Sequence, residues 1–228
     1  MSKLRRRVGS PSKTKKLMLN ADVLTFQEFV MHEPLPLSKI QEAVLEFLQG
    51  RDDAVLFGAQ AVNAYVSEPR MTQDVDILST RAKELAEEMR EYLSEKFHIA
   101  VRVREIGEGK GFRIYQVRSE GNRHLVDIRN ENNFPATLEV ERIRILAPVE
   151  LIASKVISFK SRYGQAKSWS DRRDLTLLLL QFPKLKVLGG EVEKVLENRG
   201  ANEETIIFWQ ELVEQDLIIT NEDDELSF

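Results

Sequence analysis

Two aspartates alternate with apolar residues in one short segment of this chain. Residues 74–79 read DVDILS, so Asp74 and Asp76 are separated by Val75 and followed by Ile77. If the segment is a strand, both carboxylates lie on one face, about 7 Å apart along the backbone, while the apolar residues face the core. Like charges in a partly buried place repel each other unless a cation neutralises them. The pattern therefore predicts a divalent-cation site, and a solvent-facing strand kept soluble by its acids is the alternative.

The segment before these aspartates has the pattern of a phosphate-binding turn. A short apolar run at 54–57 is predicted to be a buried strand, and a helix of small residues begins after it at Gly58 or Ala59. Free backbone N–H groups at a helix N-terminus attract phosphate oxygens. Arg70 and Thr72 stand just before the aspartates, where a guanidinium would bind phosphate or pair with the nearby acids. An ordinary strand-to-helix turn is the alternative interpretation of the glycine.

Apolar periodicity predicts an α+β fold, with a mixed β-sheet core flanked by helices and a helical segment after it. Strands are predicted at 54–57, 74–79, 99–106, 112–118 and 123–129, and helices at 38–50, 59–66, 80–97 and in four segments after Pro148. Polar turns between the last three strands predict antiparallel hairpins. Ser38 and Gln41 have the spacing of a capping box. We divide the chain into a basic tail and lead-in (1–35), a core (36–147) and a C-terminal helical segment (148–228).

The first 16 residues form a basic arm. It holds seven lysines and arginines and no acid, so it contributes +7 to a net charge of −4 and the remainder carries −11. Such an arm can bind RNA phosphates, because each neutralised phosphate releases counterions. A solubilising tail and an organellar transit peptide are the alternatives. The acidic end, NEDDELSF, is expected to be a frayed tail.

Composition excludes several kinds of site. The chain has no cysteine, so it has neither disulfides nor a thiolate nucleophile, which fits a reducing, cytoplasmic compartment. His32, His98 and His124 lack the spacing of metal ligands, and a zinc site is not expected. No apolar run approaches the roughly 18 residues that span a bilayer, so no membrane association is expected.

Together these segments resemble the nucleotidyltransferase superfamily of DNA polymerase beta-like folds. Its pattern is a strand, Gly-Gly or Gly-Ser at the start of a helix, Asp-x-Asp on the next strand and a third carboxylate on a later strand. LFGAQA, RMTQDVDIL and HLVDIR match it, the last with Asp127. Glu120, Glu131 and Glu139 are rivals for the third carboxylate. Ala59 departs from the usual second glycine or serine.

The Arg-x-Thr-x-Asp-x-Asp variant looks most like the abortive-infection toxin-type (AbiEii-like) nucleotidyltransferases, over about residues 50–180. That group carries a lysine on the first helix after the core, then an arginine and an Asp-x-x-Asp-Leu stretch. Lys155, Arg162, Asp171 and Asp174 match these positions. Asp171 also fits a capping box with Ser168, and Lys155 also fits a solvated lysine at a helix surface.

The resemblance implies transfer of a nucleoside monophosphate from a nucleoside triphosphate, such as ATP, to a hydroxyl acceptor, with release of pyrophosphate. Mg²⁺ or Mn²⁺ would be held by Asp74, Asp76 and Asp127, and the nucleotide would be bound by Gly58, Ala59, Arg70, Thr72 and Lys155. The acceptor is left open among tRNA or other RNA, a protein and an aminoglycoside-type small molecule. An antitoxin is a further expected partner. A non-catalytic module of the same fold that binds nucleic acid or protein is the alternative function.

Overall fold

The computed structural model describes residues 35–217, so the predictions for the basic arm and the acidic end concern residues outside that range. The strands are β1 (Ala54–Phe57), β2 (Val75–Ser79), β3 (Val101–Ile106), β4 (Gly111–Gln116), β5 (Arg123–Asn130), β6 (Thr137–Val140) and β7 (Ile143–Leu146). The helices are α2 (Leu37–Leu48), α3 (Gly58–Tyr65), α4 (Ala82–Phe97), α5 (Pro148–Ser161), α6 (Ala166–Gln181), α7 (Glu191–Asn198) and α8 (Glu203–Glu214), with a short 3₁₀ helix η1 (Pro183–Leu185).

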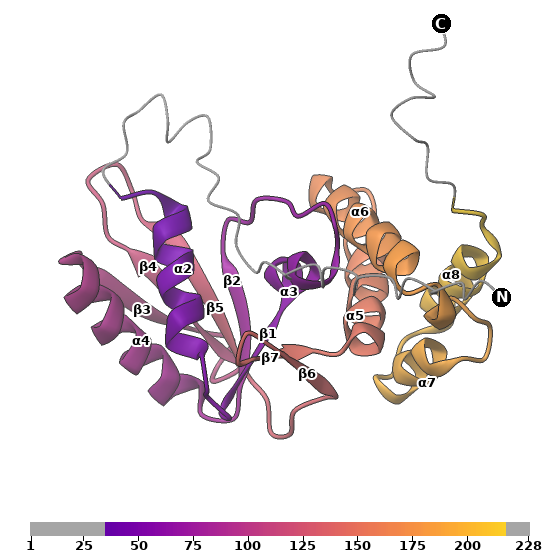
Figure 1. The fold of residues 1–228 in the computed structure, drawn as a ribbon, viewed down its shortest axis with the longest axis horizontal. Coiled ribbons are helices and arrows are strands. Elements are labelled where there is room, and N and C mark those ends of the chain that lie inside the picture. Colours follow the sequence, from indigo (N-terminus) through magenta and orange to yellow (C-terminus); the bar gives the residue numbers. More distant parts are fainter. Residues whose placement is uncertain (1–34, 218–228) are drawn as a thin grey trace, which may run out of the picture.

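The strands form one mixed seven-stranded sheet in the order β3-β4-β5-β2-β1-β7-β6 (Figure 1). β2 runs antiparallel to β1 and parallel to β5, while β3, β4 and β5 pair as the predicted antiparallel hairpins. α4 packs against β2 to β5 and contacts α2, whereas α3 lies against β1 and β2 and is contacted by α5 and α6. The predicted α+β fold class, a mixed sheet flanked by helices and followed by a helical segment, is confirmed.

The hairpin of β6 and β7 was not predicted from the sequence. Each strand has four residues, and charged residues interrupt the apolar pattern of both. Glu141 and Arg142 form the two-residue turn with φ of 51° and 64°, positions where glycine or asparagine is usual. The turn residues therefore do not predict a hairpin. The hairpin is recognised only in the structure, where β7 pairs with both β6 and β1.

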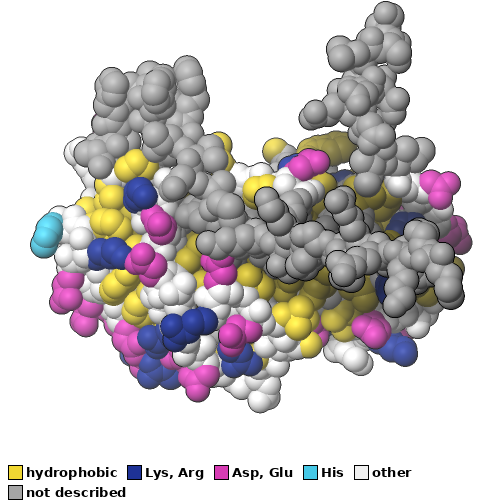
Figure 2. All heavy atoms as spheres, in the orientation of Figure 1, with side chains coloured by type: hydrophobic (Ala, Val, Ile, Leu, Met, Phe, Trp, Pro, Cys, Tyr) yellow, Lys and Arg dark blue, Asp and Glu magenta, His cyan; other side chains and the backbone are white. Residues whose placement is uncertain are grey.

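The amphipathic helix α4 buries the stripe that its sequence predicts. Leu85, Met89 and Leu93, at four-residue spacing, are shielded completely from solvent. Burial of a large apolar side chain stabilises a fold by about 1.5–3 kcal/mol, so this stripe anchors the helix. Acidic and basic side chains are interspersed where the described surface is visible in Figure 2.

After Pro148 the described chain contains only helical elements, as predicted. Pro148 begins α5, a position where its missing N–H group costs no hydrogen bond. α5 and α6 pack against each other, and α7 and α8 pack against α5. Within residues 35–217 we find no helix with the length and apolar character needed to cross a bilayer.

The predicted capping box at the start of α2 is wrong. Pro36 is the N-cap residue, no side chain caps the helix, and Ser38 lies inside its first turn. Gln41 is buried on the apolar side of α2, where its amide donates to the carbonyl and hydroxyl oxygens of Thr72 at 3.0 and 3.1 Å. Helix packing thus turns Gln41 away from the helix end, where a capping box would need it.

The end of β1 brings α3 against β2. Phe57 pairs with Asp76 across the β1–β2 ladder, and α3 begins at the next residue, Gly58. Gly58 has φ of +67°, in the left-handed region that favours glycine. A Cβ atom on Gly58 would lie 2.0 Å from Oδ2 of Asp76 and 2.8 Å from its Cβ atom. Glycine is therefore required for Asp76 to lie where the strand register puts it.

We expect Gly58→Ala to destabilise the protein more than Gly164→Ala. Gly164 also has a positive φ, +80°, but nothing lies within 4 Å of the place that its Cβ would take. Gly164→Ala should cost about 1–2 kcal/mol of unfolding free energy, the strain of a left-handed backbone alone. Gly58→Ala adds the clash with Asp76 and should cost a further ~1–3 kcal/mol. Urea unfolding measures both, and equal losses would show that the Asp76 contact imposes no constraint.

Candidate active site

Two strands that are distant in the sequence bring the predicted carboxylates together. β2 and β5 are parallel neighbours whose register pairs Asp76 with Asp127. Neighbouring strands lie about 4.8 Å apart, so these two residues are adjacent across the sheet. Asp74 stands directly before β2 and approaches the same group through His124. The structure thus collects all three predicted carboxylates beside the start of α3.

The three rival glutamates lie elsewhere. Glu120 is exposed in the turn between β4 and β5, and Glu131 follows the end of β5 that is remote from that turn. Glu139 is exposed on β6, the edge strand of the sheet. Of the four acidic residues considered for the third position, the structure places Asp127 next to Asp76.

Of the three carboxylates, Asp76 has the fewest partners for its negative charge. It is partly buried, and none of the residues in the described part of the chain donates a hydrogen bond to it or forms an ion pair with it. Burial raises the pKa of Asp76 to about 6, and the negative charge of Asp74 adds to the shift. A carboxylate that is shielded from water in part and has no partner is costly, and an oxygen-seeking cation such as Mg²⁺ would stabilise it. The residues present therefore fit a divalent ion.

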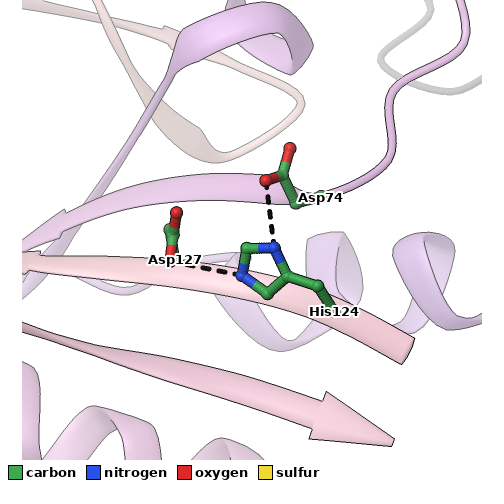
Figure 3. A group of neighbouring side chains, drawn as sticks. All are labelled: Asp74, His124 and Asp127. Carbon is green, nitrogen blue, oxygen red and sulfur yellow. Dashed lines mark ion pairs between the residues drawn. The ribbon is translucent and has the colours of Figure 1, made fainter. Parts of the chain in front are cut away.

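His124 lies between Asp74 and Asp127 (Figure 3). Its Nδ1 is 3.3 Å from Oδ2 of Asp74, and its Nε2 is 3.2 Å from Oδ1 of Asp127. The contact with Asp127 raises the pKa of His124 above its usual value, although burial opposes this. The sequence analysis did not include this histidine in the site.

Asp127 has two cationic neighbours. The Nε–H of Arg113, its partner on β4, donates to Oδ1 at 2.7 Å, and His124 approaches the same oxygen. Burial alone would raise the pKa of Asp127, but His124 and Arg113 outweigh it and hold that pKa below its usual value. Asp127 is therefore a charged carboxylate that is available as a metal ligand.

A buried ion network joins the loop before β2 to α5 and α6. Arg70 donates from Nε and Nη2 to the two oxygens of Asp174, at 2.8 and 2.9 Å. Lys155 lies 2.7 Å from Asp174 and 3.3 Å from Asp171, which also pairs with Arg162 at 3.1 Å. Asp174 is fully buried, so its charge is stable only with these partners. The positive charge of Lys155 also acts on Asp76, where it lowers the pKa less than the charge of Arg129 on β5 does.

Two interpretations of this network from the sequence are wrong. Ser168 and Asp171 form no capping box, because α6 begins at Ala166 and Asp171 is turned inward to its ion pairs. Lys155 is not a solvated lysine, because it is buried against α6. Arg70 pairs with an acid as the alternative interpretation expected, but that acid comes from α6. Binding of phosphate by Arg70 and Lys155 stays a prediction.

Two amides of α3 hold the loop that carries Arg70 and Thr72. Asn63 donates to the carbonyl oxygen of Arg70 at 2.7 Å and accepts from its backbone N–H at 3.0 Å. Gln60 donates to the hydroxyl of Thr72 at 2.8 Å, so Thr72 is buried and hydrogen-bonded within the protein. The sequence analysis missed both amides. The sequence signal that could have revealed them is their spacing: the two amides are three residues apart among small apolar residues and so lie on one face of α3.

An apolar cavity of about 430 Å³ lies at the start of α5 and the end of α6. Pro148, Val149, Phe182, Pro183 and Leu185 are among its lining residues, and no residue of the carboxylate group lines it. The cavity therefore has no part in the chemistry of Asp74, Asp76 and Asp127.

The mixed seven-stranded sheet and its flanking helices match nucleotidyltransferase-like folds among solved structures. A Helicobacter pylori protein described as a nucleotidyltransferase matches with a TM-score of 0.54 and 13% identity, over 87% of this chain and 89% of its own. The protein JHP933 from Helicobacter pylori matches with a TM-score of 0.53 and 12% identity, over 87% of each chain. The Megavirus polyadenylate synthase matches with a TM-score of 0.53 and 13% identity, over 75% of this chain and 40% of the viral one.

No protein-family model matches the chain, and no curated protein sequence does. Identities of 12–13% show a shared fold, so activity and substrate are to be inferred from the site. None of these three structures bears on the abortive-infection group, and the likeness to it stays a prediction.

The metal-free protein should lose stability as the pH rises through the range in which Asp76 ionises. The folded pKa of about 6 lies above the ordinary value of 3.8, so the folded chain holds this proton more tightly than the unfolded chain. The contribution is complete below about pH 4 and is lost as the pH passes about 6, at most ~3 kcal/mol in all. Urea unfolding with a chelator from pH 4 to 7.5 measures it.

Asp76→Asn is the control for this titration. Its unfolding free energy should fall less with rising pH than that of the wild type, because the amide has no proton to lose. Parallel pH profiles for the two proteins would show that Asp76 is solvated and unstrained.

Proposed function

We propose that this chain is a metal-dependent nucleotidyltransferase, which moves a nucleoside monophosphate from a nucleoside triphosphate to a hydroxyl acceptor and releases pyrophosphate. The observation that carries the proposal is Asp76, a partly buried carboxylate without a hydrogen-bond partner in the described chain, next to Asp127 and to the start of α3. The shared fold supports it. A non-catalytic binding module would have no use for an unneutralised carboxylate group at this position.

Asp74, Asp76 and Asp127 would hold Mg²⁺ or Mn²⁺, which supplies charge neutralisation for the leaving pyrophosphate and lowers the pKa of the acceptor hydroxyl. The acceptor oxygen bonds to the α-phosphorus as the bond from that atom to the bridging oxygen breaks, and pyrophosphate leaves with the electron pair. Asp127 would accept the hydroxyl proton. Little covalent chemistry is asked of the protein, so the lack of cysteine is no obstacle.

The triphosphate would bind at the start of α3, where the N–H groups of Gly58 and Ala59 carry partial positive charge. Arg70 and Lys155 would add charge-assisted hydrogen bonds. Because Asp174 neutralises both cations, the phosphates would share them with that carboxylate. Thr72 would act through the loop, since Gln41 and Gln60 occupy its hydroxyl.

For the acceptor we propose RNA, such as tRNA. Tyr163 and Trp169, in the α5–α6 turn and the first turn of α6, are each 74% exposed. Lys160 lies over the ring of Tyr163, and Lys167 belongs to the same segment. Exposed rings among cations can stack on bases while the cations hold phosphates. An aminoglycoside is itself a polycation and would be repelled by such a surface.

Arg162 ties this turn to the ion network beside the carboxylates, because it precedes Tyr163 and pairs with Asp171. An RNA end bound on the two rings would therefore lie on the side of the protein where the ion network meets the proposed catalytic carboxylates. The basic arm, residues 1–16, would add phosphate contacts. An antitoxin remains a proposed partner on the abortive-infection resemblance alone.

Asp127→Asn should bind nucleoside triphosphate with nearly normal affinity and lose transfer. Asp74 and Asp76 still provide two metal ligands, whereas the acceptor loses its base, which is worth roughly 10²–10⁴-fold in rate. The assay incubates full-length protein with Mg²⁺ or Mn²⁺, labelled triphosphates and total RNA, and follows label transfer in single turnover. Glu139→Gln on β6 is the matched control and should behave as wild type. Normal turnover by Asp127→Asn would remove that residue from the site, and binding without any wild-type turnover would favour the non-catalytic module.

Trp169→Ala should weaken RNA binding by about five-fold or more, because one aromatic ring stacked on a base contributes roughly 1–3 kcal/mol. Triphosphate affinity should not change. Fluorescence anisotropy with labelled tRNA at fixed salt concentration measures the affinity. Leu138→Ala, which removes another exposed apolar side chain, 50% exposed and on β6, is the control. If both variants bind tRNA equally, the aromatic surface does not receive the acceptor.

A further inference from the structure

An irregularity in β5 turns His124 toward the carboxylates. The β4–β5 ladder pairs Ile114 with Val126 but Tyr115 with His124, so Leu125 is an extra residue without a partner on β4. In a regular strand, residues three apart face opposite sides, and His124 would point away from Asp127. The bulge restores both to one face. Bulges of this kind recur beside active sites, where they re-aim a side chain.

The spacing of the three side chains suits one metal ion. One ligand atom each from Asp74, His124 and Asp127 lies within 4.8 Å of the others (Figure 3). An imidazole binds one ion through a single nitrogen. Nε2 of His124 lies 3.2 Å from Oδ1 of Asp127, whereas the 3.3 Å contact with Asp74 is made by Nδ1. Two ligands that each bind one ion at about 2.1 Å lie roughly 3.0–3.4 Å from each other.

The imidazole is held in place without hydrogen bonds to its buried nitrogen. Nε2 of His124 is buried and has no hydrogen-bond partner within the described chain, because its contact with Asp127 lacks the alignment of a hydrogen bond. The ring packs beside Tyr115, with centroids 5.2 Å apart. A ring nitrogen that faces a carboxylate oxygen without an aligned hydrogen bond can be turned to a metal ion that the carboxylate also binds.

We infer that His124 is a nitrogen ligand of the metal site, so that one ion is bound by Asp74, His124 and Asp127 and is a first-row transition ion in preference to Mg²⁺. Imidazole binds Co²⁺ and Zn²⁺ strongly and Mn²⁺ acceptably, while Mg²⁺ prefers oxygen ligands. Asp76 stands outside this triad and, with the triphosphate, keeps an oxygen-only environment suited to Mg²⁺. The inference rests on the proposed function, because it uses the same carboxylates.

The test uses the full-length chain and follows metal binding directly. Mn²⁺ bound to the wild type should show the ¹⁴N coupling of a directly ligated histidine in electron spin-echo spectra. Co²⁺ titration followed by visible absorption should give an affinity that His124→Asn lowers by at least about ten-fold. The affinity for Mg²⁺, measured by calorimetry, should change little in the same variant.

His98→Asn is the matched control. His98 ends α4 in the left-handed conformation, φ 53°, which asparagine tolerates, and it takes no part in the carboxylate group. Its Co²⁺ affinity should equal that of the wild type. The spin-echo measurement needs no substitution, so it decides the question even if His124→Asn does not fold.

Absence of the nitrogen coupling in the wild type, or equal Co²⁺ affinities for His124→Asn and His98→Asn, would overturn the inference. Transfer activity with Mg²⁺ in a protein without nitrogen coupling would leave the proposed function standing and remove only the histidine ligand. A wild type that binds neither Mn²⁺ nor Co²⁺ and transfers no label would remove both.

Discussion

Repulsion among three carboxylates, two on the adjacent strands β2 and β5 and one directly before β2, governs the organisation of this protein. Asp76 is placed by the β1–β2 register, with room made by Gly58, and no hydrogen bond from the described chain compensates it. Cationic side chains lie closer to Asp127 than to Asp76. Arg113 and His124 approach Asp127, while Arg129 and, more weakly, Lys155 act on Asp76 through space. The remaining negative charge is concentrated where a divalent ion and a triphosphate would meet, which is how the geometry favours nucleotidyl transfer.

The buried carboxylate of Asp174 gives the core and the helical segment a common anchor. It binds Arg70 from the loop before β2 and Lys155 from α5, and α6 could not pack here with an unpaired charge. Buried ion pairs contribute little net stability, but removal of one partner leaves a buried charge uncompensated. The network therefore links the position of the helices to the cations that the nucleotide would use.

Much of the fold was accessible from local patterns. The strand at 54–57, the helix that begins at Gly58 and the inward stripe of α4 follow from periodicity and from the conformational freedom of glycine. The β6–β7 hairpin was not accessible, because its turn residues Glu141 and Arg142 carry no turn signal. The capping boxes failed for another reason: packing turned Gln41 and Asp171 inward, and tertiary contacts override a local preference of about 1 kcal/mol.

The sequence by itself determined the chemistry of the candidate site. Asp74 and Asp76 share one segment, and Asp127 lies in an apolar strand, so their identity depends on near neighbours in the chain. Only the tertiary structure decided which cationic groups lie near the negative charges of these aspartates. Arg70 and Asp174 are 104 residues apart, and their pairing follows from how α6 packs on α3. His124 reaches the carboxylates through a bulge, which period-two alternation cannot reveal because it adds one residue to a single strand.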